Sequence, residues 1–97
     1  MNAVWFDPRA EEEFLLGAQC YEDQEPGLGS RFIAAVKMAV RVASASPRIH
    51  SQIFGGCRKC RVVRFPSALI LCERNEEVHI ISVMHTQPSP YYWLVRI

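Results

Sequence analysis

The sequence lacks the features that would place this chain in a membrane or mark it for export. No apolar run approaches the roughly 20 residues that a helix needs to span a bilayer, and no cationic leader followed by an apolar block opens the chain. It also has no internal repeat, no low-complexity tract and no linker. Because 97 residues are enough for one hydrophobic core and too few for two, we expect a single cytoplasmic domain spanning residues 1–97.

The chain has almost no net charge, but its charges are unevenly distributed along the sequence. Eleven Lys and Arg against ten Asp and Glu give +1 overall. Residues 1–47 carry four Lys or Arg and seven Asp or Glu, a net charge of −3, whereas residues 48–97 carry seven and three, a net charge of +4. A basic half can present a positive face to an anionic partner; alternatively, these side chains simply solvate a sheet edge.

The four cysteines lack the companions that a metal site would need. Cys57 and Cys60 have metal-binding or redox spacing, but a structural zinc site needs two further ligands, usually a second close pair, and the histidines are scattered. A redox CxxC normally opens a helix, whereas these residues begin an expected strand, in which they would point to opposite faces. We therefore expect ordinary thiols, with no metal, no cofactor and, without an export signal, no disulfide framework. Cys20 and Cys72 occupy apolar positions and should be small core residues.

The N-terminal half predicts a strand followed by two helices. Residues 3–6 are short and apolar, which suits a strand. Asp7 and Pro8 mark a helix start, because Asp can cap free backbone N–H groups and Pro fits the first helical position. That helix should end near Glu25-Pro26-Gly27, and a second helix should follow at once and stop before Pro47. The short connection predicts an antiparallel helix hairpin.

The C-terminal half predicts an antiparallel meander. After a loop over residues 48–56, strands are expected at 58–65, 68–74 and 78–84, with a tight turn at Asn75-Glu76-Glu77. The whole pattern indicates an α+β domain with an N-terminal strand, an antiparallel helix hairpin and a mostly antiparallel sheet of three or four strands, one face of which the helices cover.

Alternation along the last long strand assigns each of its side chains to one face of the sheet. One face should carry His79, Ile81, Val83 and His85, and the other Val78, Ile80, Ser82 and Met84. In the strand expected at 58–65, Pro66 should interrupt the ladder at a bulge or bend. Residues 91–97 should form a short extra strand or a docked tail.

An ordered set of residues extends over nearly the whole chain and resembles a known family. The set comprises Pro8, Ala10 and Glu12; the tract Gln24–Gly29 with Phe32; Pro47; Arg58; Phe65 and Pro66; Val83 and His85; and Pro90, Trp93 and Arg96. It resembles the RelE/ParE superfamily of toxins from bacterial type II toxin–antitoxin modules, and its ParE branch most closely. Three positions near the expected functional edge depart from residues that are frequent in the family: Ser67, Cys72 and Pro88.

The resemblance implies one of three functions. A ParE-like toxin of a plasmid-stabilisation-like module binds and inhibits DNA gyrase without an active site of its own, and we favour this reading. A RelE-like toxin would be a ribosome-dependent mRNA endonuclease. The three departures also suit a toxin fold that has lost its activity and remains an interaction module. A cognate antitoxin is the implied partner, bound in an exposed groove between the helix hairpin and the sheet, and a homodimer is compatible with the resemblance.

The candidate site residues lie in the basic strand and the C-terminal tail. For target binding we single out six residues: Arg58, Lys59, Arg61, Arg64, Trp93 and Arg96. A ribonuclease would instead use Arg58 and Arg61 to bind phosphate, supported by the two neighbouring cations, and His85 as general acid or base. Tyr91 or Tyr92 could then stack on a base. Alternatively, His85 is a hydrogen-bonded packing residue.

Overall fold

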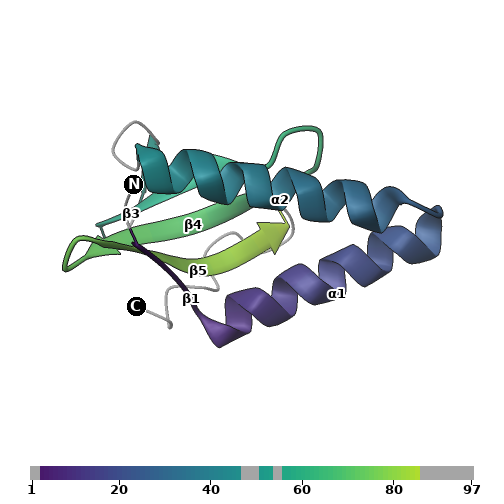
Figure 1. Ribbon diagram of the computed structural model, residues 1–97, viewed down its shortest axis with the longest axis horizontal. Coiled ribbons are helices and arrows are strands. Elements are labelled where there is room, and N and C mark those ends of the chain that lie inside the picture. The colour runs from purple at the N-terminus through teal and green to yellow at the C-terminus, as the bar shows by residue number, and fades with distance from the viewer. Residues whose placement is uncertain (1–2, 47–50, 54–55, 86–97) are drawn as a thin grey trace.

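Two helices and five strands make up the described part of the chain. The computed structural model describes residues 3–46, 51–53 and 56–85. In chain order the elements are β1 (Ala3–Phe6), α1 (Pro8–Gln24), α2 (Leu28–Ala45), β2 (Ser51–Gln52), β3 (Cys57–Arg61), β4 (Ser67–Arg74) and β5 (Glu77–His85). The helices form an antiparallel hairpin over one face of the sheet (Figure 1), so the expected α+β fold class is confirmed. No described helix is long and apolar enough to cross a membrane.

Local interactions determine where both helices begin. Asp7 caps α1 by accepting a hydrogen bond from the backbone N–H of Arg9 at 2.8 Å. Gly27 precedes α2 with a φ of 90°, a left-handed conformation that glycine adopts without steric cost. The Glu22 carboxylate accepts hydrogen bonds from the backbone N–H groups of Gly27 and Gly29, at 3.0–3.2 Å. The corner between the helices is therefore held by α1 itself, and the expected bounds of both helices are confirmed.

The sheet has the order β1-β5-β4-β3-β2. β1 pairs with β5 in parallel, and the other neighbouring pairs are antiparallel. β4 and β5 are joined by Asn75 and Glu76, both with positive φ, which is the two-residue turn that suits the twist of a hairpin. The expected tight turn is thus confirmed. The expectation of a plain loop over residues 48–56 was wrong, because Ser51 and Gln52 pair with Lys59 and Arg58 of β3.

The first long strand is shorter than expected. It ends at Arg61 and not at residue 65, because the chain turns immediately afterwards. The N–H of Phe65 donates to the carbonyl of Val62 at 3.2 Å, and the N–H of Val62 donates to the carbonyl of Ser67 at 3.0 Å. Arg64 occupies the third position of this turn with a φ of 72°. The last residues of the expected strand, 62–65, therefore form a tight turn between β3 and β4.

The expected alternation along β5 is broken by a β-bulge. Ile70 pairs with Ser82, whereas Leu71 pairs with Ile80, so the register between the two strands shifts by one residue at Ile81. The extra residue changes the phase of the strand. Val83 consequently joins the helix-side core instead of sharing a face with Ile81, and the strict face assignment was wrong beyond this point.

Both faces of the sheet bury apolar side chains. The helix-side core consists of Ala10, Ala18, Phe32, Val36, Ala39, Ala43, Cys60, Val62, Leu69, Leu71, Val78, Ile80 and Val83. The opposite core consists of Cys57, Ala68, Ile70, Cys72, Ile81 and Met84. Burial on both faces explains why β4 is a nearly continuous apolar run and not an alternating one.

The cysteines differ from expectation in two ways. Cys57 and Cys60 do point to opposite faces of β3, as expected. However, Cys57 forms a disulfide with Cys72, because the antiparallel register places these two residues directly opposite each other. The expectation that no disulfide would form was therefore wrong. Cys20 is exposed and not part of the core, since it lies two residues beyond the buried Ala18, off the apolar stripe of α1.

Candidate functional site

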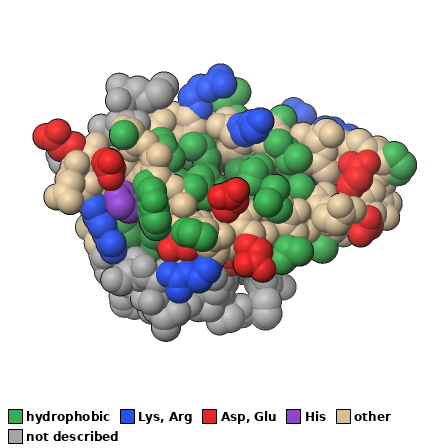
Figure 2. Space-filling view, turned by 60° about the horizontal axis from the view of Figure 1, so that its bottom comes forward, with side chains coloured by type: hydrophobic (Ala, Val, Ile, Leu, Met, Phe, Trp, Pro, Cys, Tyr) green, Lys and Arg blue, Asp and Glu red, His purple; other side chains and the backbone are tan. Residues whose placement is uncertain are grey.

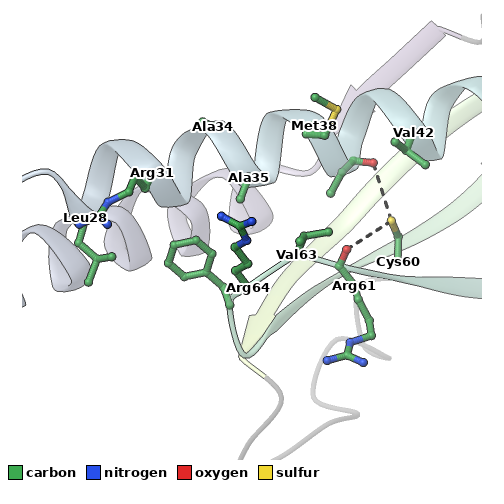
Figure 3. A pocket seen from close by; sticks show the side chains of 12 residues that line it. Leu28, Arg31, Ala34, Ala35, Met38, Val42, Cys60, Arg61, Val63 and Arg64 are labelled. Atoms are coloured by element: carbon green, nitrogen blue, oxygen red, sulfur yellow. Dashed lines mark hydrogen bonds between the residues drawn. The ribbon is translucent and has the colours of Figure 1, made fainter.

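A groove of about 740 Å³ separates α2 from the end of β3 and the turn that follows it. We call it the basic groove, and it is lined by Leu28, Arg31, Ala34, Ala35, Met38, Ala39, Val42, Cys60, Arg61, Val63, Arg64 and Phe65 (Figure 3). Three of its apolar side chains are solvent-exposed: Met38 at 52%, Val42 at 42% and Val63 at 69%. A groove with exposed apolar walls is typical of a surface that another molecule covers.

Every charged residue among the described residues that line the basic groove is an arginine. Arg31, Arg61 and Arg64 line it, although the Arg61 side chain extends away from it, and no described Asp or Glu does. The α2 wall also contains no acidic residue from Leu28 to Ala45, while α1 exposes several. By contrast, acidic, basic and apolar side chains are interspersed on the face seen in Figure 2, which turns the α1 side of the molecule toward the viewer. The groove is therefore complementary to an anionic, partly apolar ligand.

Aromatic packing holds the turn against the helices. The ring of Phe65 lies 5.0 Å from the ring of Tyr21 and 5.1 Å from that of Phe32, centroid to centroid, in edge-to-face geometry. The Cys60 thiol donates a weak hydrogen bond to the carbonyl of Ala39, at 3.8 Å, and so links β3 to α2. Burial raises the pKa of the Cys60 thiol. These contacts fix the two walls of the groove relative to each other.

The four cations of the basic strand do not form one surface. Arg58 pairs with Leu71, whose side chain is in the helix-side core, so Arg58 lies on the helix side of the sheet. Lys59 and Arg61 pair with residues of the opposite core and lie on the other face. Arg64 lies beyond the strand, in the turn. In Figure 3 the Arg64 side chain extends toward α2 near Ala35, whereas that of Arg61 extends away from the groove.

His85 lines a different cleft, on the α1 side of the molecule. This α1 cleft, of about 620 Å³, is lined by Glu13, Leu16, Gly17, Cys20, Tyr21, Gln24, Phe32, Pro66, Ser67, Val83 and His85. No Lys or Arg is among these residues. His85 is exposed at the end of β5, where it pairs with Ser67. The bulge at Ile81 has placed it on the helix side of the sheet.

The residues of the ribonuclease hypothesis are therefore not gathered around one point. Arg61 lies on the opposite face of the sheet from His85. Arg58 is on the helix side, but its partner Leu71 is four residues along β4 from Ser67, the partner of His85, which corresponds to about 13 Å. Trp93 and Arg96, together with Tyr91 and Tyr92, lie outside the described residues.

Glu13 ties α1 to the bulge of β5. Its Oε1 atom accepts hydrogen bonds from the Ser82 hydroxyl at 3.1 Å and from the backbone N–H of Val83 at 3.3 Å. The bulge disrupts the ladder locally, and the carboxylate supplies an acceptor there. Glu13 therefore helps to set the face on which His85 lies.

Within the described ranges, no group of three His, Cys, Asp or Glu side chains is arranged to hold a metal ion. Cys57 is joined to Cys72, so the CxxC pair does not present two free thiols to one ion.

Sequence reasoning did not identify the α2 wall of the basic groove. Its contributors are Arg31, Met38 and Val42, which lie off the apolar stripe that packs on the sheet. A signal was nevertheless present, because α2 carries three cations, no carboxylates and a methionine outside its buried stripe. Such a helix is basic and apolar on its exposed side, which is unusual for a purely solvated surface.

Comparison with known proteins gives a likeness of structure and not of sequence. No protein-family profile matches the chain. No curated protein matches it at the sequence level. A solved chain described as the chromosomal ParDE TA (toxin–antitoxin) system from P. aeruginosa superimposes with a TM-score of 0.65, at 13% sequence identity, over 88% of this chain and 96% of that one. The two chains therefore share a fold, which covers nearly the full length of both.

Proposed function

We propose that this chain is the toxin of a type II toxin–antitoxin module and that the basic groove receives a segment of its cognate antitoxin. The observation that carries the proposal is the groove itself, with three exposed apolar side chains and, among the lining residues that the structure describes, arginines and no carboxylates. The shared fold with a ParDE chain supports it. So does the family resemblance in the sequence, which implies a partner that wraps around the toxin.

For the cellular target, we propose DNA gyrase, bound without catalysis by this chain. A ribonuclease needs cations at the phosphate and an acid or base at the same point. Among the described residues that line the α1 cleft with His85 there is no Lys or Arg, and Arg61 is on the other face of the sheet. An inhibitor that acts by binding does not need its cations around one reacting atom. Lys59, Arg61 and Arg64 can therefore contribute to target binding although they lie at separate positions.

The target is tested with purified protein in two parallel reactions, a gyrase supercoiling assay and a translation reaction that reports ribosome-dependent mRNA cleavage. We expect inhibited supercoiling or trapped cleaved DNA, and intact mRNA. The His85→Ala variant should inhibit gyrase as the wild type does, because the imidazole has no catalytic task in this account. Cut mRNA together with unaffected supercoiling, and loss of cutting in His85→Ala, would establish the endonuclease instead.

A further inference from the structure

Arg64 has a backbone conformation that arginine rarely adopts. Its φ is 72°, in the left-handed region where Cβ crowds the following carbonyl oxygen. The hydrogen bond from Phe65 N–H to Val62 C=O makes Arg64 the third residue of a tight turn, a position that normally calls for Gly or Asn when φ is positive. The backbone alone would therefore favour glycine at position 64.

The position of the Arg64 side chain explains why an arginine is found at this strained backbone position. It extends from the turn into the basic groove, toward the α2 wall near Ala35 (Figure 3). Within the described part of the chain, Arg64 forms no ion pair, whereas Arg31 on the opposite wall is paired with Glu25 at 3.1 Å. A guanidinium that forms no ion pair with the described carboxylates thus lines the same groove as the exposed apolar side chains of Met38 and Val63. Backbone strain of this kind is typically retained where the strained residue has a functional role.

We propose that Arg64 is the anchor of the basic groove and binds a carboxylate of an acidic, amphipathic helix of the protein partner. The inference rests on the proposed function, because it concerns the same groove. A guanidinium binds a carboxylate through two parallel N–H···O bonds, which fixes the position of the partner along the groove. The apolar side chains of such a helix, spaced every three or four residues, fill a groove of this kind. With the Arg64 cation in the groove and no carboxylate among its described lining residues, an acidic helix is favoured over a basic one.

The proposal makes an unusual prediction for one substitution. Arg64→Gly should stabilise the fold, raising the thermal unfolding midpoint by roughly 2–8 °C, because glycine adopts positive φ without the steric cost. The same substitution should weaken partner binding by roughly 10- to 100-fold, because a charge-assisted contact is lost. Arg64→Lys should keep the backbone strain and retain part of the affinity. The ammonium keeps the positive charge but cannot form the two parallel hydrogen bonds of a guanidinium.

A matched control is available at the other end of the sheet. Glu76 also has positive φ, at 64°, in the turn between β4 and β5. It does not line the basic groove. Glu76→Gly should therefore stabilise the fold to a similar extent and leave binding unchanged.

The experiment uses the full chain and two fluorescein-labelled 21-residue peptides, measured by fluorescence anisotropy. Both peptides carry Leu at i, i+3, i+4 and i+7 spacing, with Glu at the remaining positions in one and Lys in the other. We expect the wild type to bind the Glu peptide at least about 10-fold more tightly than the Lys peptide. One charge-assisted hydrogen bond contributes enough free energy for a difference in affinity of this size. We expect Arg64→Gly to lose most of that preference.

Each contrary result overturns a different statement. Wild-type affinity in Arg64→Gly would show that Arg64 is not the anchor, and a lower unfolding midpoint in that variant would show that the conformation is not strained. Equal affinity for both peptides would overturn the acidic helix as occupant. If neither peptide binds while the chain still inhibits gyrase, the inference fails and the proposed function stands. Concentration-dependent self-association that protects the groove from peptide would make a second copy of the chain the occupant, against the proposal.

Discussion

Cys57 and Cys72 face each other across the β3–β4 ladder, with their Cα atoms 4.5 Å apart and a disulfide bond joining their side chains. Both are almost fully buried in the core on the sheet face opposite the helices. Since the bond connects positions 15 residues apart in sequence, it closes a short loop that contains the turn with Arg64. It therefore constrains the hairpin that forms one wall of the basic groove.

Reduction of this disulfide should lower the stability of the protein. A loop of 15 residues corresponds to about 3 kcal/mol of free energy of unfolding in the chain-entropy description. Urea denaturation with and without dithiothreitol measures the difference. The double variant Cys57→Ala/Cys72→Ala should be insensitive to the reductant, and it is the control. Four titratable thiols in the unreduced, denatured protein would contradict the assignment.

The two free cysteines should differ in reactivity. Cys20 is exposed, whereas Cys60 is buried and burial raises its pKa. At neutral pH, iodoacetamide should therefore label Cys20 first, because the thiolate is the nucleophile and access is needed. A raised folded-state pKa means that the stability contributed by the neutral Cys60 thiol is complete below the pKa of the unfolded chain. This contribution is lost as pH rises through the higher folded value.

Mass spectrometry of timed labelling, with Cys20→Ser as the control, distinguishes the two sites. Equal labelling rates at pH 7 in the folded protein would be inconsistent with a buried Cys60.

Gly29 should not tolerate a side chain. A Cβ atom at this position would lie 2.6 Å from the carbonyl oxygen of Ala18 and 2.9 Å from the Glu22 side chain, so the two helices would have to separate. Gly29→Ala should cost about 1–3 kcal/mol of unfolding free energy, the usual range for overpacking. The neighbouring exposed Ser30→Ala is the matched control and should change stability little. A Gly29→Ala protein as stable as wild type would show that the corner is looser than described.

Removal of the Glu13 carboxylate should disturb the bulge in β5. Glu13→Ala leaves the Ser82 hydroxyl and the Val83 N–H without this acceptor, which should cost about 1–3 kcal/mol. Glu13→Gln keeps a carbonyl acceptor and should be milder. Urea midpoints give the stabilities, and the amide chemical shifts of Val83 and His85 report the local geometry. If Glu13→Ala leaves those shifts and the midpoint unchanged, the bulge does not depend on α1.

Much of the fold could be predicted from the sequence because short-range chemistry determines it. Asp7 followed by Pro8 begins α1, Gly27 permits the corner, and Asn75 with Glu76 makes the β4–β5 turn. Each signal acts within a few residues of its effect. The resulting order of elements is enough to specify the α+β class.

The remaining features depend on contacts between distant residues. The bulge at Ile81 is stabilised by Glu13, which precedes Val83 by 70 residues, so alternation within β5 gives no sign of it. The disulfide depends on the register between β3 and β4. The expectation of free thiols was based on the lack of an export signal, which carries no information about that register.

The candidate site was only partly predictable for the same reason. A groove between hairpin and sheet was expected, and a groove with basic lining is present there. Its α2 wall was not predicted. The sequence places Met38 and Val42 on an exposed helix face but does not show that the turn containing Val63 and Arg64 lies opposite them.

The most direct test of the account is growth of a bacterial culture that expresses this chain from an inducible promoter, with and without the small protein encoded beside its gene. We predict growth arrest when the chain is expressed alone and normal growth when the two are co-expressed. We also predict that the groove variant Met38→Glu still arrests growth but is no longer rescued by the neighbour. Normal growth in every case, or full rescue of Met38→Glu, would contradict the claim that the basic groove is the antitoxin-binding surface of a toxin.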